Sequence, residues 1–87
     1  MDFVVIRERG LAWDDSRPLR EQDGWPEHAA FMEALVDDGF VLFGGPFGDS
    51  VRTLLIVDAP SEQAIHDRLA ADPWTPTGYL RIVSVER

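Results

Sequence analysis

Residues 40–57 have the sequence FVLFGGPFGDSVRTLLIV, and this stretch decides the fold. It contains two apolar runs, over 40–44 and 52–57, whose β-branched and aromatic side chains are typical of strands. The residues between the runs, 45–50, include Gly, Pro, Asp and Ser, which favour a turn. The stretch therefore predicts two consecutive strands in the middle of the chain, joined by a turn that begins at Gly45.

A helix is predicted on each side of this pair of strands. On the N-terminal side, residues 25–39 carry Pro26, which suits the first helical position, and Gly39, which suits a C-terminal cap. On the C-terminal side, Ser61 is a good N-cap for a short helix that stops at Pro73. The apolar stripe of the first helix consists of Phe31, Met32, Leu35 and Val36, and that of the second of Ile65 and Leu69.

Two more apolar segments, residues 2–8 and 79–85, predict strands at the two ends of the chain. The element order is then βαββαβ, which is typical of a ferredoxin-like α+β sandwich, a four-stranded antiparallel sheet with both helices on one face. Residues 9–24 are rich in charge and lack periodicity, so they predict a long exposed loop. A chain of 87 residues is long enough for one domain, and we expect residues 1–87 to form a single one.

Acidic residues dominate the charge of the chain. There are 16 Asp and Glu against 8 Arg, and the formal net charge is −8. Such a chain repels phosphate groups, so we expect binding neither to nucleic acid nor to a membrane surface. The sequence has no Cys, no apolar run of about 18 residues and no basic segment at its start, so we expect a cytoplasmic protein without disulfides.

The predicted strands carry apolar side chains on both faces of the sheet. In the first strand, for example, Val4 and Ile6 alternate with Phe3 and Val5. Two helices cover only one face, and an antiparallel sheet with an open face normally shows polar residues there. We therefore expect a homodimer packed sheet to sheet. The alternative is that the long loop and the C-terminal residues cover the second face.

One His and one Asp are candidates for acid–base chemistry. His28 begins the apolar stripe of the first helix, so we expect it to be partly buried, although a lone His on such a face is more often a core or capping residue. Asp72 follows Leu69 by three positions and lies near the sheet-facing side of the second helix, where its ordinary role is helix termination. If the two side chains approach each other, the carboxylate would hold one imidazole nitrogen protonated and leave the other as a general base.

Other residues near this pair could contact a ligand. Trp25 and Trp74 would form aromatic walls for a flat organic molecule, or would pack in the core. Arg20, in the long loop, would bind an anionic substrate or pair with a neighbouring acid such as Glu21. The sequence contains no Gly-rich phosphate loop, nucleophilic serine motif or metal-ligand spacing, so we expect no cofactor and no metal.

Three motifs occur in order along nearly the whole chain. They are Trp25-x-x-His28-x-x-Phe31-x-x-x-Leu35-x-x-x-Gly39, Gly44-Gly45-Pro46 and Asp72-Pro73-Trp74. This set resembles the YCII-related (YciI-like) family. The resemblance implies a dimeric ferredoxin-like fold of the α/β-barrel type, similar to the muconolactone isomerase group, in a family with a dehydrochlorinase branch. It also implies an active site at His28 and Asp72, with Gly45 and Pro46 lining the cleft and Trp74 where Phe is more usual.

Together these observations favour a small cofactor-independent enzyme. In this hypothesis His28, oriented by Asp72, moves a proton on a small cyclic or aromatic molecule, as in isomerisation or loss of HX. The substrate contacts would come from Trp25, Gly45, Pro46, Trp74 and Arg20. Two alternatives stay open: a non-catalytic domain that binds a small ligand in the same cleft, and a purely structural dimer module.

Overall fold

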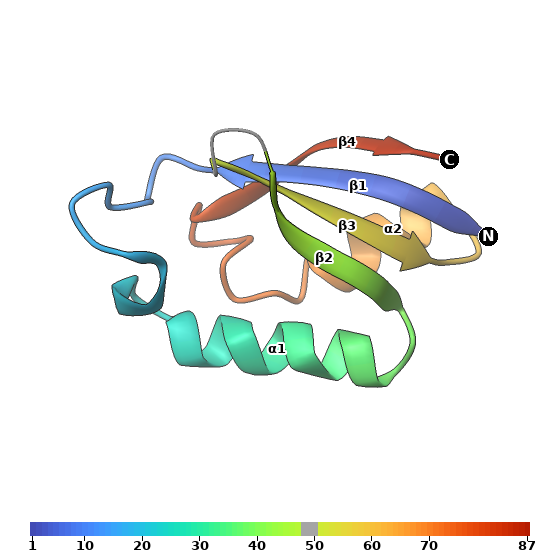
Figure 1. The fold of residues 1–87 in the computed structure, drawn as a ribbon, viewed down its shortest axis with the longest axis horizontal. Helices are drawn as coiled ribbons and strands as arrows, with labels where there is room; N and C mark the ends of the chain where they lie inside the picture. Colours follow the sequence, from blue (N-terminus) through green and yellow to red (C-terminus); the bar gives the residue numbers. More distant parts are fainter. Residues whose placement is uncertain (48–50) are drawn as a thin grey trace.

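The computed structural model describes residues 1–47 and 51–87, and these form a four-stranded antiparallel sheet and two α-helices. The elements are β1 (Asp2–Arg9), α1 (Trp25–Asp37), β2 (Val41–Phe47), β3 (Arg52–Asp58), α2 (Glu62–Leu69) and β4 (Leu80–Glu86). The strand order is β2-β3-β1-β4, and both helices lie on the same side of the sheet (Figure 1). The predicted ferredoxin-like α+β fold is therefore confirmed. No helix in the described ranges is long and apolar enough to cross a membrane.

The hydrophobic core fills the space between the sheet and the two helices. Every second residue of β1 and β3 points into it, and the pairs Phe3–Val57 and Val5–Leu55 lie side by side in the register. Leu35 of α1 and the α2 residues Ile65 and Leu69 form the helix side of the core. The period of two in the strands and the 3.6-residue stripe in the helices thus produce one buried layer.

The predicted start of the turn at Gly45 is wrong, because β2 continues through Gly45 and Pro46 to Phe47. β2 is an edge strand, so a proline in it need not cost a ladder hydrogen bond to a neighbour. Gly44 also lies close to β3, since a Cβ atom at this position would come within 2.8 Å of Leu55 Cδ2. The turn residues expected at 48–50 lie outside the described part of the chain.

The long loop between β1 and α1 has local structure of its own. It contains a short 3-10 helix, η1 (Leu19–Glu21), and a buried glutamine, Gln22, that ties the loop together. The Gln22 amide donates to the carbonyl oxygens of Asp14 and Arg17 and accepts from the Asp14 backbone N–H. Because its backbone is bonded in this way, the loop is held in place on one side of α1.

The face of the sheet opposite the helices carries apolar side chains. Phe43 of β2 is 65% exposed and lies beside Ile56, which the register places on this outer face. Val4 and Ile6 of β1 pair there with Ile56 and Leu54 of β3. Trp13 of the long loop packs on Trp74 and Tyr79.

Candidate active site

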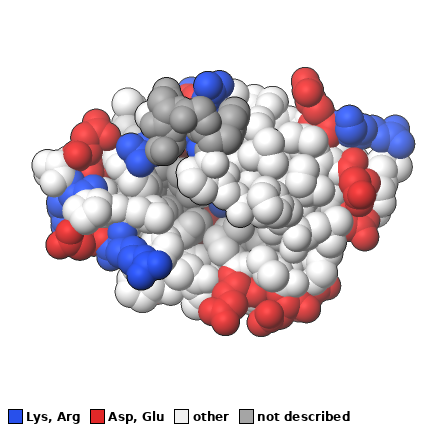
Figure 2. Space-filling model, viewed as in Figure 1, with Lys and Arg blue, Asp and Glu red and all other residues white. Residues whose placement is uncertain are grey.

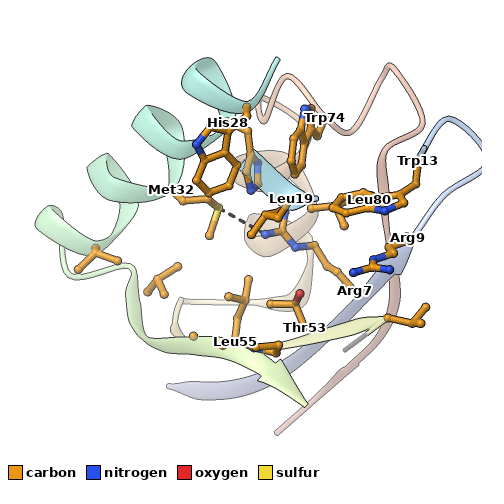
Figure 3. A pocket seen from close by; sticks show the side chains of 17 residues that line it. Arg7, Arg9, Trp13, Leu19, His28, Met32, Thr53, Leu55, Trp74 and Leu80 are labelled. Atoms are coloured by element: carbon orange, nitrogen blue, oxygen red, sulfur yellow. Dashed lines mark hydrogen bonds between the residues drawn. The ribbon is translucent and has the colours of Figure 1, made fainter. Parts of the chain in front are cut away.

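A pocket of about 450 Å³ lies between α1 and the sheet. Its walls come from three parts of the chain: α1 with the loop before it, the helix-facing side of the strands, and the segment after α2 (Figure 3). The lining residues that carry polar or aromatic groups include Arg7, Arg9, Trp13, Trp25, His28 and Trp74. Gly45 and Pro46 of the edge strand β2 contribute to the rim of the same pocket.

His28 and Asp72 meet at the inner wall of this pocket. The imidazole Nδ1 lies 2.9 Å from Asp72 Oδ1 and 2.8 Å from Oδ2. A carboxylate only accepts hydrogen bonds, so Nδ1 carries a proton, and in the neutral imidazole Nε2 then has the lone pair. Nε2 has no hydrogen bond to any other described residue. The pair thus has the geometry of an oriented general base, with Asp72 fully buried behind His28.

Arg7 completes the site, and our reading of the sequence missed it. Its Nη1 donates to Asp72 Oδ2 at 3.0 Å, and the residue is only 2% exposed. The signal was present in the first strand, because Phe3, Val5 and Arg7 share one face and two of the three are core residues. An arginine at a core position needs a buried partner, and that requirement could have identified it.

The charges of the site shift two pKa values. Burial acts to raise the pKa of Asp72, whereas the hydrogen bonds from His28 and from the Trp74 backbone N–H act to lower it. With the charges of His28 and Arg7 added, the net pKa of Asp72 is lowered. Burial lowers the pKa of Arg7, against the opposing effect of Asp72. Since arginine starts far above neutral pH, the buried pair remains ionised.

Trp74 fixes the plane of the imidazole. Its indole ring stacks on the His28 ring with a centroid distance of 4.0 Å and an interplanar angle of 8°. The Trp74 Nε1–H donates to the Asp23 carbonyl at 2.8 Å, and its backbone N–H donates to Asp72 Oδ1 at 2.9 Å. Trp25 lies against both rings, 5.8 Å from His28 and 5.9 Å from Trp74. Stacking and hydrogen bonds together leave the imidazole little freedom to rotate.

Arg20 is not part of this site, contrary to expectation. It is exposed, and it lies on η1 next to Leu19, which does line the pocket. Successive residues of a 3-10 helix point about 120° apart, so the turn that brings Leu19 inward carries Arg20 outward. Arg17, in the same loop, pairs with Asp23 at 3.4 Å.

The other histidine lies apart from the pocket. His66 is exposed on α2, where its Nε2 lies 3.6 Å from Glu62 Oε2. Among residues 1–47 and 51–87, no group of three or more His, Asp or Glu side chains is placed to hold a metal ion. The His28 site therefore consists of one imidazole, one carboxylate and one guanidinium.

Solved structures of two enzymes share this fold. One is 5-chloro-2-hydroxyhydroquinone dehydrochlorinase (TftG) from Burkholderia phenoliruptrix AC1100, in complex with 2,5-dihydroxybenzoquinone. It matches with a TM-score of 0.69 and 27% identity over 100% of this chain and 92% of its own. The other is muconolactone isomerase, with a TM-score of 0.69 and 20% identity over 97% and 86% of the two chains.

A comparison with curated protein sequences gives no significant match. The family model of the YCII-related domain, in contrast, matches residues 6–87, which include the second half of β1, both helices and every residue of the site described above. The chain belongs to the YCII-related domain family.

Proposed function

We propose that the protein is a small cofactor-independent enzyme in which His28 transfers a proton on a small cyclic or aromatic substrate. The observation that carries the proposal is the hydrogen bond of 2.8 Å between His28 Nδ1 and the buried Asp72 carboxylate. It leaves Nε2 as a base at the wall of a pocket with several aromatic rings. The fold shared with an isomerase and a dehydrochlorinase supports chemistry of this kind.

The reaction begins when Nε2 takes a proton from an acidic C–H group of the substrate. The electron pair of the broken bond moves into an adjacent carbonyl group and forms an enolate. The imidazolium is stabilised by Asp72, whose carboxylate accepts from Nδ1. In an isomerisation, the Nε2 proton returns to another carbon of the substrate. In an elimination, the enolate instead expels halide, and His28 later releases its proton to water.

Arg7 balances the charges that are present during this reaction. Before the reaction Arg7 and Asp72 cancel each other, and His28 has to be neutral for Nε2 to accept a proton. After proton transfer, the site holds an imidazolium and the substrate holds an anion, so the two new charges attract across the pocket. Without Arg7, Asp72 would be a buried carboxylate with only the imidazole as a charged partner, which is costly in a low-dielectric interior.

Exchange of carbon-bound hydrogen with solvent tests the proposal. A suitable probe is 2,5-dihydroxybenzoquinone, whose ring C–H groups exchange through a keto tautomer. We expect the protein to accelerate loss of the ring proton signal in D₂O, followed by NMR. If the protein bound both 2,5-dihydroxybenzoquinone and 5-chloro-2-hydroxyhydroquinone but accelerated no reaction of either compound, the non-catalytic ligand-binding domain would be favoured instead.

We also propose that two chains pack through the outer faces of their sheets. The support is the apolar side chains on that face, including Phe43 and Val83, which are 65% and 47% exposed. We expect sedimentation to give twice the 9.8 kDa of one chain for the wild type. Phe43→Glu should give the mass of a monomer, because dimerisation would bury the Glu charge in the interface. Leu11→Glu, which changes an exposed loop residue, is the matched control and should leave the dimer intact.

A further inference from the structure

The pocket is positively charged, although the chain carries a net charge of −8. Its lining includes Arg7, Arg9 and His28 but no Asp or Glu among the described residues, because Asp72 lies behind His28. Figure 2 shows the same separation on this face: the hollow is bordered mostly by uncharged and blue side chains, and the red ones gather at the edges of the molecule. An acidic protein with a basic pocket attracts an anion to one place.

Two nitrogen atoms of the Arg7 guanidinium lack a good hydrogen-bond acceptor among the described residues. Its guanidinium contributes Nη1 to Asp72, whereas Nη2 faces the Met32 thioether at 3.4 Å. Its Nε is buried and has no hydrogen-bond partner within the described part of the chain. A thioether is a weak acceptor, and a buried donor without a partner is costly. The second side of this guanidinium therefore suits an oxygen atom of a bound molecule.

Arg9 carries a charge that no described carboxylate neutralises. It follows Arg7 by two residues, so both side chains lie on the pocket side of β1 (Figure 3). The Arg9 guanidinium stacks over the Trp13 ring, 4.4 Å from its centroid, and forms no ion pair within residues 1–47 and 51–87. The indole fixes the guanidinium through a cation–π contact, and no residue in the described ranges accepts a hydrogen bond from its N–H groups.

The charges of the pocket predict the charge of its ligand. Arg7 and Asp72 form an ion pair at 3.0 Å and cancel each other, and His28 is neutral when it acts as a base. Among the described residues, Arg9 then leaves the site with one unmatched positive charge. A ligand with one negative charge would neutralise it and would gain a charge-assisted, bidentate hydrogen bond to a guanidinium.

We propose that this pocket selects planar substrates that carry an anionic oxygen group, and that Arg9 is the residue that recognises this group. The anionic oxygens contact Arg9, a second oxygen of the ring contacts Arg7, and the ring lies against Trp25 with its reacting atom toward His28 Nε2. This inference rests on the proposed function for the role of His28. The preference for an anion depends only on the arginines.

Matched probes test the preference. The anion 2,5-dihydroxybenzoate and the neutral 2,5-dihydroxybenzamide have nearly the same size and ring, so calorimetry on both isolates the charge. We expect the wild type to bind the benzoate at least about tenfold more tightly, consistent with a charge-assisted hydrogen bond. In Arg9→Gln the two dissociation constants should become similar. Arg20→Gln removes an exposed arginine outside the pocket and should keep the wild-type ratio.

Several outcomes would overturn the inference: equal binding of the two probes by the wild type, tighter binding of the benzamide, or an unchanged ratio in Arg9→Gln. Arg9→Lys retains the charge without the bidentate fork, so its ratio of the two dissociation constants should lie between those of the wild type and Arg9→Gln. An intermediate ratio would show that Arg9→Gln loses its preference for the benzoate through the changed side chain and not through misfolding. Calorimetry with both probes on His28→Gln measures anion binding in a variant without the proposed base. It therefore separates the proposed role of Arg9 from the proposed role of His28. Selective benzoate binding without hydrogen exchange in the wild type would refute the enzyme and leave the anion site standing, whereas exchange without selectivity would do the reverse.

Discussion

Replacing His28 by Gln should lower the rate of substrate hydrogen exchange by about 10²- to 10⁴-fold, the usual contribution of a positioned general base. Glutamine is similar in length and polarity to histidine, but its amide cannot take a proton at neutral pH. The dissociation constant of the probe should change little, because the walls formed by Trp25 and Trp74 remain. Steady-state rates and calorimetry on the same protein separate the two effects.

His66→Gln is the matched control for this variant. His66 is exposed and pairs with Glu62 on α2, so its loss should leave the exchange rate unchanged. If His28→Gln exchanged hydrogen as fast as the wild type, His28 would not be the base and the proposed mechanism would be wrong. If both variants slowed exchange equally, the effect would be one of general destabilisation.

Replacing Asp72 by Ala should destabilise the protein by about 3 to 5 kcal/mol, the range found when one partner of a buried ion pair is removed. The change leaves the Arg7 guanidinium buried without its counter-charge, and it also removes the acceptor of His28 Nδ1 and of the Trp74 backbone N–H. Urea denaturation at neutral pH measures the loss as a lower midpoint. Asp38→Asn, which breaks the exposed pair with Arg68, should cost much less.

A double variant shows whether the loss comes from the unpaired charge. Arg7→Met combined with Asp72→Leu removes both charges and fills the space with apolar groups, so it should recover part of the stability that Asp72→Ala loses. It should not recover hydrogen exchange, because His28 then lacks its orienting acceptor. Equal destabilisation in the single and double variants would mean that packing around Asp72, rather than the Arg7 charge, sets the cost.

The lowered pKa of Asp72 also predicts how stability depends on pH. A carboxyl whose pKa is lower in the folded than in the unfolded state stabilises the fold above its unfolded pKa, which is about 3.9 for Asp. This contribution is lost as the pH falls through the folded value. The free energy of unfolding of the wild type should therefore decrease below about pH 4, and Asp72→Asn should lack this part of the decrease.

The sequence predicted the elements well because their signals are local. The apolar, β-branched run in residues 2–8 and the stripe through Phe31 and Leu35 depend only on neighbours a few positions away. The prediction failed at Gly45 and Pro46, since the same residues suit a turn or an edge strand. Only pairing with β3 decides between the two, and that pairing is set by the sheet.

The amino-acid sequence by itself determined the order of strands and helices, the apolar faces and the acidic balance of the chain, because each follows from composition or short-range periodicity. The tertiary structure decided the site. It brings His28 to Asp72 across 44 residues and Arg7 to Asp72 across 65, and it buries all three. No local pattern encodes such a meeting, because it depends on how β1 and the segments around α1 and α2 pack. Burial then fixes the charges that give the pocket its chemistry.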